Sequence, residues 1–345
     1  MRSLGILGLA TLLIGAALAL PIVSVLSSFL VGTSETWSYV VSTALPAYVG
    51  NTLLLLAAVS WGVISMGVLC AWLVTAYRFP GQGVLQWALM LPLAMPAYVM
   101  AYAYTDWLQF TGPVQSALRT ATGWEAREYW FPEIRSLWGA AAMLSFALYP
   151  YVYLVARTAF HDMSRSAIEA GRLAGLSAWG AFFRVAVPLA RPAIVAGTSL
   201  ALMETLADFG TVSYFAVEVF TTGIFRAWLS LGDSVAAAQL SACLLAFVAL
   251  VLGLERASRG RAAYHAGTQR KPAPPQVLRG GAGALAFAAC AAPVVFGFAL
   301  PALLLLGLAW DERLQYLGAR MAALVANSFG VAGLTAIVAV ALAAV

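Results

Sequence analysis

The sequence predicts an all-α protein, folded as a polytopic bundle of transmembrane helices. Of its 345 residues, 62% are hydrophobic and only 10% are charged. The mean hydropathy of +0.88 is far above that of an ordinary soluble domain. Apolar stretches long enough to cross a bilayer recur along the chain. About eight spans are expected, at 4–30, 50–77, 84–109, 136–158, 193–215, 234–255 and 282–309, with the last beginning near 326.

The first apolar run has two interpretations. Arg2, an apolar core and Ala17-Leu18-Ala19 together are typical of a cleaved secretory signal. The run continues to Leu30, however, which is longer than the core of a signal peptide. We therefore interpret it as the first membrane span.

Charge placement predicts the orientation of the spans. With the N-terminus in the cytoplasm, 13 of the 19 Lys and Arg residues lie in cytoplasmic segments, and the opposite orientation would reverse this bias. We expect a multi-pass membrane protein with a cytoplasmic N-terminus. The net charge of +5 is then a topology signal, and no nucleic-acid partner is expected.

The chain is predicted to contain one half of a repeated structure and the start of another, because two short patterns repeat. Ala19-Leu20-Pro21 is echoed by Ala299-Leu300-Pro301, and Asn51, which opens the second span, by Asn327, which opens the last. The predicted division is a first half with about six spans, a cytoplasmic linker rich in Pro, Gly and Arg, and the start of a second half, at 1–256, 257–281 and 282–345. A full second copy would require more spans, so we expect the natural chain to continue; the alternative is a complete protein with an unusual last helix.

A polar loop between the fourth and fifth spans has the pattern of two short helices. Ser166 and Glu169 form an S-x-x-E capping box, which predicts a helix start. Gly175 is expected to end that helix in the left-handed conformation that glycine adopts without strain. Ser177 is expected to cap a second short helix, which Pro188 would end.

The first of these helices would present small and aliphatic side chains on one face, namely Ala170, Leu173 and Ala174. A helix–Gly–helix with such a face suits the groove of another protein. On local pattern alone, an ordinary surface hairpin is the alternative.

The spacing within this loop is more specific than its composition. Glu169-Ala170-Gly171 is followed after three residues by Gly175, and after nine more by Val185-Ala186-Val187-Pro188. This pattern resembles the EAA loop of ABC-importer permeases, which reads Glu-Ala-Ala, three residues, Gly, nine residues, Ile-x-Leu-Pro. Here Gly replaces one Ala, and Val replaces both Ile and Leu. The substitutions keep the small and aliphatic character of each position.

The resemblance implies a type I (MetI-like) ABC importer permease of the bacterial inner membrane. Its loop 159–192 would dock on a cytoplasmic ABC ATPase, expected as a dimer. The residues implied in coupling are Ser166, Glu169, Ala170, Gly171, Leu173, Ala174, Gly175 and Pro188.

The chain is predicted to have no motor and no catalytic residue of its own. A P-loop requires Gly-Lys-Ser/Thr, whereas Lys271, the only lysine, lies between Arg270 and Pro272. ATP and Mg²⁺ would be used by the partner, and no cofactor is expected in this chain. The outer loops are too short to capture a substrate, so a separate periplasmic binding protein is expected.

Two carboxylates mark a candidate translocation path. Glu204 and Asp208 are four residues apart within the fifth predicted span, which places them on one helix face. Ionisable groups at membrane depth are costly and commonly line a water-filled path. The alternative is a structural role, in hydrogen bonds to neighbouring helices or in an ion pair.

The third span adds further candidates for the path. Pro92 and Pro96 are expected to kink it, since neither has a backbone N–H to donate. Tyr98, Tyr102 and Asp106 follow at helical spacing, and their oxygens suit a hard cation. The alternative for the tyrosines is an interfacial aromatic belt or helix packing. The cysteines Cys70, Cys243 and Cys290 all fall within spans, so neither a disulfide nor a Cys-rich metal site is expected.

The stretches 91–104, 201–215, 220–228 and 236–240 resemble the ferric-iron subfamily of these permeases. This resemblance implies a fused permease for Fe³⁺ that works with a periplasmic iron-binding protein, and it assigns no metal ligand firmly. Thiamine, sulfate, phosphonate and polyamine permeases share much of the architecture and are alternatives. Two other classes are alternatives: an ion-gradient-driven secondary transporter with Glu204 and Asp208 as its relay, and an intramembrane enzyme. The enzyme is disfavoured because the sequence contains neither HExxH nor GxSxG.

Overall fold

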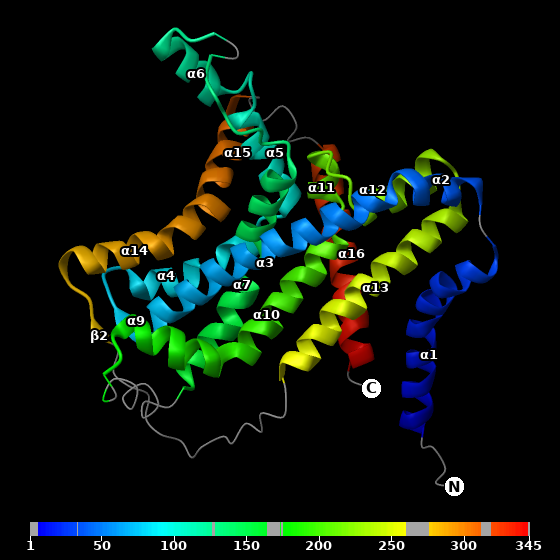
Figure 1. Cartoon of the computed structure of the whole chain (residues 1–345), viewed down its shortest axis with the longest axis horizontal. Helices are drawn as coiled ribbons and strands as arrows, with labels where there is room; N and C mark the ends of the chain where they lie inside the picture. The colour runs from blue at the N-terminus through cyan, green and yellow to red at the C-terminus, as the bar shows by residue number, and fades with distance from the viewer. Residues whose placement is uncertain are drawn as a thin grey trace.

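The computed structural model folds the chain into a bundle of long helices (Figure 1). It describes residues 6–32, 34–125, 128–163, 173, 175–259, 276–311 and 319–343. The first elements are α1 (Ile6–Ser27), η1 (Ser28–Leu30), α2 (Glu35–Thr43), α3 (Leu45–Ala76), β1 (Tyr77–Arg78), α4 (Gln82–Ala88), η2 (Leu91–Ala94), α5 (Ala97–Leu108), α6 (Pro113–Thr122) and α7 (Leu137–His161). They are followed by α9 (Ala178–Ala181), η3 (Phe182–Ala186), α10 (Val187–Ala207), α11 (Gly210–Tyr214), α12 (Phe220–Phe225), η4 (Arg226–Ser230), α13 (Ser234–Arg259), β2 (Gln276–Val277), α14 (Gly280–Val294), η5 (Val295–Ala299), α15 (Leu300–Asp311) and α16 (Ala319–Ala343).

The predicted all-α class is confirmed. In the described part of the chain, strands are limited to β1 and β2, which pair in parallel with Tyr77 opposite Gln276. Seven described helices are long and apolar enough to cross a membrane, and a bent pair makes an eighth candidate. The predicted boundaries of the fifth span, 193–215, are wrong: the helix runs over Trp179–Ala207. It starts earlier because the polar loop before it is itself partly helical.

Helix α7 lies at the centre of the bundle, between α3 and α10, and glycines make this close packing possible. A Cβ atom on Gly67 of α3 would lie 2.8 Å from Val152 Cβ and 3.0 Å from the Tyr149 carbonyl oxygen. A Cβ atom on Gly197 of α10 would meet the Val152 backbone at 2.8 Å. Small residues at such crossings let helices in a membrane approach to backbone contact.

The close packing at Gly67 leads to a prediction about the stability of the protein. Gly67→Ala is expected to destabilise the protein by about 1–3 kcal/mol, because the new methyl group meets backbone that cannot move aside. Gly50→Ala on the same helix is the matched control. Its Cβ meets no other atom within 4 Å, and replacing Gly in a helix gains up to about 1 kcal/mol. Unfolding temperatures in detergent test the pair, and equal values for the two variants would contradict the prediction.

The predicted kink in the third span is confirmed and is a full break. The segments Gln82–Ala94 and Ala97–Thr122 meet at an angle of 90°. The first arm is held by two tyrosines of α7: the Tyr149 hydroxyl donates to the Leu89 carbonyl at 2.9 Å, and the Tyr153 hydroxyl to that of Gln86 at 2.8 Å. They satisfy carbonyls near the break that would otherwise lack partners in an apolar environment.

The first elements after the predicted linker, α14, η5 and α15, pack on the earlier helices. The Tyr104 hydroxyl of α5 donates to the Phe296 carbonyl of η5 at 2.6 Å. Cys70 of α3 lies beside Cys290 of α14; both are buried free thiols, so they form no disulfide. The division of the chain into two halves stays a prediction.

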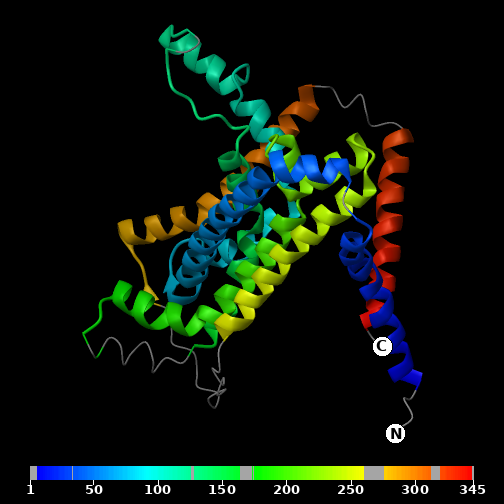
Figure 2. The ribbon, with the colours of Figure 1, turned by 45° about the vertical axis from the view of Figure 1, so that its right-hand side comes forward.

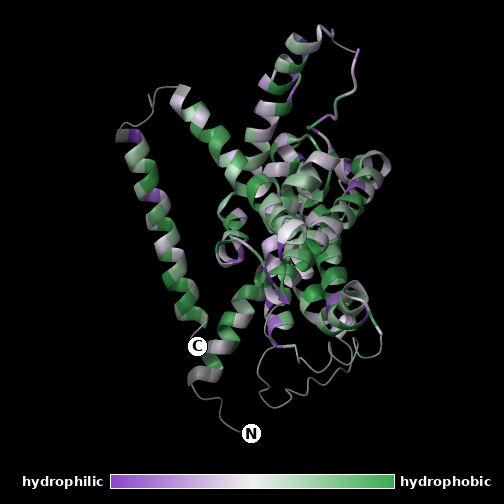
Figure 3. Ribbon diagram, turned by 90° about the vertical axis from the view of Figure 1, so that its left-hand side faces the viewer, coloured by the Kyte–Doolittle hydropathy of each residue, from purple (hydrophilic) through white to green (hydrophobic). Residues whose placement is uncertain are grey.

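Helices α1 and α16 stand at the margin of the bundle (Figure 2). Only 6% of the apolar window of α1 and none of that of α16 is buried. Hydrophobic residues lie along both helices (Figure 3). A helix that is apolar and unburied in this way fits a lipid environment.

Candidate functional site

Two helix breaks from distant parts of the sequence meet at one cavity of about 380 Å³. One is the break between η2 and α5, at Met95 and Pro96, and the other is the end of α10, at Ala207 and Asp208. The remaining lining comes from the same elements and from α7. The lining residues are Leu93, Met95, Pro96, Ala97, Leu144, Ala147, Leu148, Tyr151, Glu204, Ala207, Asp208 and Phe209. Broken helices at such a cavity expose backbone as well as side chains to it.

Asp208 does not continue the helix of Glu204, which corrects the prediction of a shared helix face. Its backbone is extended, with φ −68° and ψ 127°, and α10 ends one residue earlier. Its Oδ1 accepts the N–H groups of Thr211 and Val212 at 3.0 and 3.1 Å, and its Oδ2 accepts the Thr211 hydroxyl at 3.0 Å. The chain turns here because Asp208 caps α11 instead of extending α10.

Glu204 and Asp208 nevertheless line the same cavity. Glu204 lies in the last turn of α10 with an exposed side chain, close to Tyr151 of α7. The lining contains these two carboxylates and no lysine or arginine. The cavity therefore has an acidic wall, which attracts cations and repels anions.

The aromatic stripe on α5 lies beside the cavity. Tyr98 packs against Gly210, at 3.0 Å from where a Cβ would be, and the Tyr102 ring meets the Tyr214 ring edge-on at 6.3 Å. Both tyrosines thus contact α11. Helix packing was one of the two roles that the sequence allowed for them. Asp106 is half-buried in the last turn of α5.

The described part of the polar loop has the backbone expected for it. Gly175 adopts φ +85°, the left-handed conformation. Ser177 caps α9, since its hydroxyl accepts the Gly180 N–H at 3.1 Å. Leu173 is 90% exposed. The other predicted coupling residues before Gly175 lie outside the described residues: Ser166, Glu169, Ala170, Gly171 and Ala174.

The expected role of Pro188 as a helix terminator is wrong. Pro188 is within the first turn of α10, and the chain is helical from α9 through the π-turn η3 into α10. The Val187 N–H bonds to the Phe182 carbonyl, five residues back. The wider π-turn accommodates the missing proline donor without a break.

Sequence reasoning missed the anchors of the α10–α11 turn. The Thr221 hydroxyl donates to the Asp208 carbonyl at 2.8 Å, and Arg135 donates to the Tyr214 carbonyl at 3.0 Å. The spacing of Asp208 and Thr211 is itself a helix N-cap pattern, and it could have predicted the turn. Among the described residues, no group of three or more His, Cys, Asp or Glu side chains is placed to hold a metal ion.

The chain is similar to several membrane transport proteins. It is 30% identical over 263 residues to the Fe(3+)-transport system permease protein FbpB 2 of Haemophilus influenzae, covering 76% of this chain and 47% of that protein. It is 28% identical to the sulfate transport system permease protein CysT of Escherichia coli, over 44% of this chain and 52% of the relative. It is 30% identical to the molybdenum transport system permease protein ModB of Escherichia coli, over 45% of this chain and 65% of the relative. The chain thus spans about half to two thirds of the length of these relatives.

Solved structures support the fold. A bacterial alginate ABC transporter, crystallised with an alginate pentasaccharide-bound periplasmic protein, contains a chain that matches with a TM-score of 0.54 at 18% identity. The match covers 76% of this chain and 96% of that one. The family described as "Binding-protein-dependent transport system inner membrane component" matches residues 63–264, more than half of the sequence. The chain is therefore a member of this family of ABC-importer permeases.

Proposed function

We propose that this chain is the permease of an ATP-driven importer for ferric iron delivered by a periplasmic binding protein. The acidic wall of the Glu204–Asp208 cavity is the observation that carries the choice of substrate. Sulfate is a dianion, and two carboxylates without a basic partner would repel it. Fe³⁺ is a hard cation that prefers oxygen ligands. The identity to the Fe(3+)-transport permease is 30%, equal to that to the molybdenum permease, so the acidic wall and not the identity distinguishes the cation from the anions.

The proposed mechanism is alternating access. The loop around Gly175 docks on an ATPase dimer in the cytoplasm, where ATP and Mg²⁺ are used. The α2, α11 and α12 end then faces the periplasmic binding protein, and the N-terminus lies in the cytoplasm, in keeping with the excess of positive charge on that side. Closure of the ATPase dimer moves the loop, and this motion opens the cavity to one side of the membrane and then the other.

Uptake measurements test this proposal. Cells lacking this gene, complemented with the full-length protein or not, are given ⁵⁵Fe³⁺, labelled sulfate, labelled thiamine or a labelled polyamine. We expect complementation to restore iron uptake only. Thiamine and polyamines are the informative competitors, because they are cations that an acidic cavity would also admit. If complementation restores uptake of thiamine or of the polyamine and leaves iron uptake unchanged, the protein is still a permease, but iron is not its substrate.

The energy source is tested in the same cells. An ATP-driven importer loses uptake when ATP is depleted and keeps it when an uncoupler collapses the proton gradient at constant ATP. A secondary transporter, with Glu204 and Asp208 as its relay, shows the opposite pattern.

A further inference from the structure

A second cavity, of about 720 Å³, lies at the end of the bundle opposite α9, between α2, the start of α3, and the α12–η4 segment (Figure 1). It is larger than the Glu204–Asp208 cavity and shares no lining residue with it. Its polar lining combines carboxylates, phenols and one guanidinium, from Glu35, Glu218, Tyr39, Tyr48 and Arg226. These residues come from segments far apart in the sequence.

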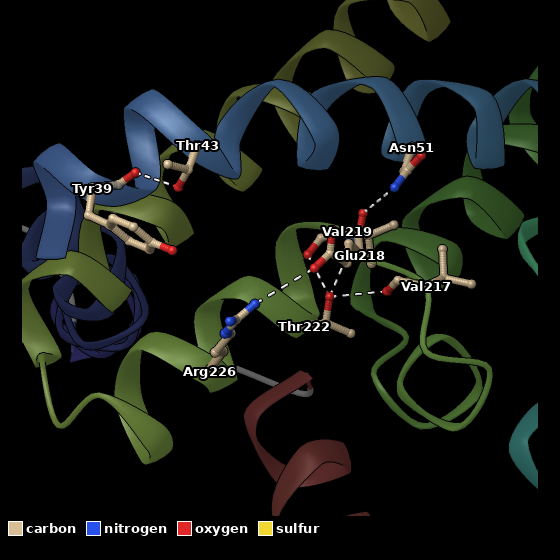
Figure 4. A network of polar contacts seen from close by, with 8 residues as sticks. All are labelled: Tyr39, Thr43, Asn51, Val217, Glu218, Val219, Thr222 and Arg226. Carbon is tan, nitrogen blue, oxygen red and sulfur yellow. Dashed lines mark hydrogen bonds and ion pairs between the residues drawn. The ribbon is translucent and has the colours of Figure 1, made fainter.

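Two charged groups of this cavity, Arg226 and Glu218, form a long and exposed ion pair. Arg226 Nη1 lies 3.7 Å from Glu218 Oε1, and the two side chains are 59% and 56% exposed. Figure 4 shows Arg226 reaching from its π-turn toward Glu218, with Tyr39 extending from the neighbouring helix. An exposed ion pair of this length contributes little to stability. Both groups are therefore free to exchange their contact for one with a ligand.

The backbone that carries these charges is fixed in place. Asn51 Nδ2 donates to the Glu218 carbonyl at 2.8 Å, which ties this loop to α3. The Val219 N–H donates to the Thr222 hydroxyl oxygen at 2.9 Å, which caps α12. Arg226 is the first residue of the π-turn η4, and the Leu231 N–H bonds to its carbonyl. A site built on anchored backbone loses little entropy when a ligand binds.

The two phenols have different environments. Tyr48 is only 2% exposed, packs on Phe220 at 6.3 Å between ring centroids, and lies beside the Arg226 guanidinium. Tyr39 is exposed on α2 and lies near Tyr48. The cavity thus has one buried and one accessible phenol oxygen next to two carboxylates.

We propose that this cavity receives Fe³⁺ that still carries a small anionic chelator. Carboxylate and phenol oxygens are hard donors that suit Fe³⁺; two carboxylates alone would be a sparse ligand set, and the phenols extend it. Arg226 would repel a bare cation, but its guanidinium matches a carboxylate or phosphate of a chelator. The volume is also that of a small-molecule site, far more than one ion needs.

The binding step is a ligand exchange without redox change. A phenol that coordinates Fe³⁺ releases its proton to water, and the metal exchanges one chelator or water oxygen for the phenolate. This inference rests on the proposed iron import and adds to it the form in which iron enters.

Visible absorption tests the proposal, because a ferric–phenolate bond produces a charge-transfer band. The full-length permease with its ATPase, in detergent, is titrated with Fe³⁺–citrate. We expect a saturable band that Tyr39→Phe and Tyr48→Phe each reduce or abolish, while phenylalanine keeps the ring packing. Glu218→Gln is expected to weaken binding at least about tenfold, the size of one lost charge-assisted contact. Tyr129→Phe, an outer tyrosine outside the cavity, is the matched control and should behave as wild type.

The role of Arg226 has its own readout. Arg226→Gln should weaken binding of Fe³⁺–citrate at least about tenfold, but leave binding of Fe³⁺–acetohydroxamate unchanged, because that chelator has no carboxylate. A wild-type protein without the band, or a band unaffected by both tyrosine variants, would overturn the proposal.

The same titration separates this site from the proposed function. The double variant Glu204→Gln, Asp208→Asn should keep the band although it loses transport. If the wild type shows the tyrosine-dependent band but cells import no iron through it, iron import is refuted and the site stands. If iron is imported and no such band forms, the site is refuted and iron import stands.

Discussion

Uptake of Fe³⁺ is expected to fall at least about tenfold with either Glu204→Gln or Asp208→Asn, and further in the double variant. A tenfold loss corresponds to about 1.4 kcal/mol. A unit charge pair at 4 Å contributes about 4 kcal/mol at an effective dielectric constant of 20, so the expected loss is a modest part of the available attraction. Initial rates of ⁵⁵Fe³⁺ uptake at equal protein level measure it.

The choice of asparagine at position 208 separates charge from structure. Asn keeps an oxygen that can accept the Thr211 and Val212 N–H groups, so the cap of α11 is retained while the charge is lost. Asp208→Ala removes both and is expected to lower the stability as well, by about 1 kcal/mol. Should Asp208→Asn transport normally while Asp208→Ala does not, Asp208 would have only a capping role.

Gly175→Pro is expected to abolish transport and substrate-stimulated ATP hydrolysis while leaving membrane insertion intact. Proline fixes φ near −65°, whereas Gly175 has φ +85°, so the loop must rearrange. No atom of the described residues lies within 4 Å of a Cβ at this position, so among them the effect is one of backbone conformation and not of a clash. ATPase activity of the reconstituted complex, with and without loaded binding protein, measures the coupling.

The matched control for this variant is Gly123→Pro. Gly123 is also left-handed, at φ +74°, and equally free of neighbours, but it follows α6 at the other end of the bundle. The Gly123→Pro variant should lose its left-handed turn, as Gly175→Pro does, but should still hydrolyse ATP in response to substrate. Equal loss of coupling in the two variants, or normal transport by Gly175→Pro, would refute the assignment of the loop.

The features that were best predicted from the sequence are those that depend on local composition and on residue spacing within one helix. Apolar length gave the positions of the spans, and Pro92 and Pro96 gave the break in the third, because both signals are contained within one helix. Gly175 and Ser177 likewise formed the predicted turn and cap from their own backbone preferences.

The sequence predictions were wrong where contacts with a neighbouring element overrode the preference of the local sequence. Helical spacing placed Asp208 on the face of Glu204, but the side chain satisfies the N–H groups of the next helix instead. Pro188 was expected to end a helix, yet a π-turn before it removes the conflict. The 720 Å³ cavity could not be predicted, because Tyr39 and Arg226 come to line one cavity only through the packing of α2 against α3 and of α12 against α13.

The uninterrupted helix between the Gly175 turn and Glu204 has a mechanical consequence. Trp179–Ala207 is 29 residues, which at about 1.5 Å per residue is roughly 43 Å of helix along its path, and that path bends between α9 and α10 (Figure 1). Under the proposed mechanism, one end sits on the motor and the other carries the acidic wall. A stroke at the loop would therefore reach the cavity through continuous helix, with Pro192 and the π-turn as the points where that helix can bend. The π-turn at Phe182–Ala186 is where its pitch changes, so this short segment would set how much of each stroke becomes rotation at the substrate.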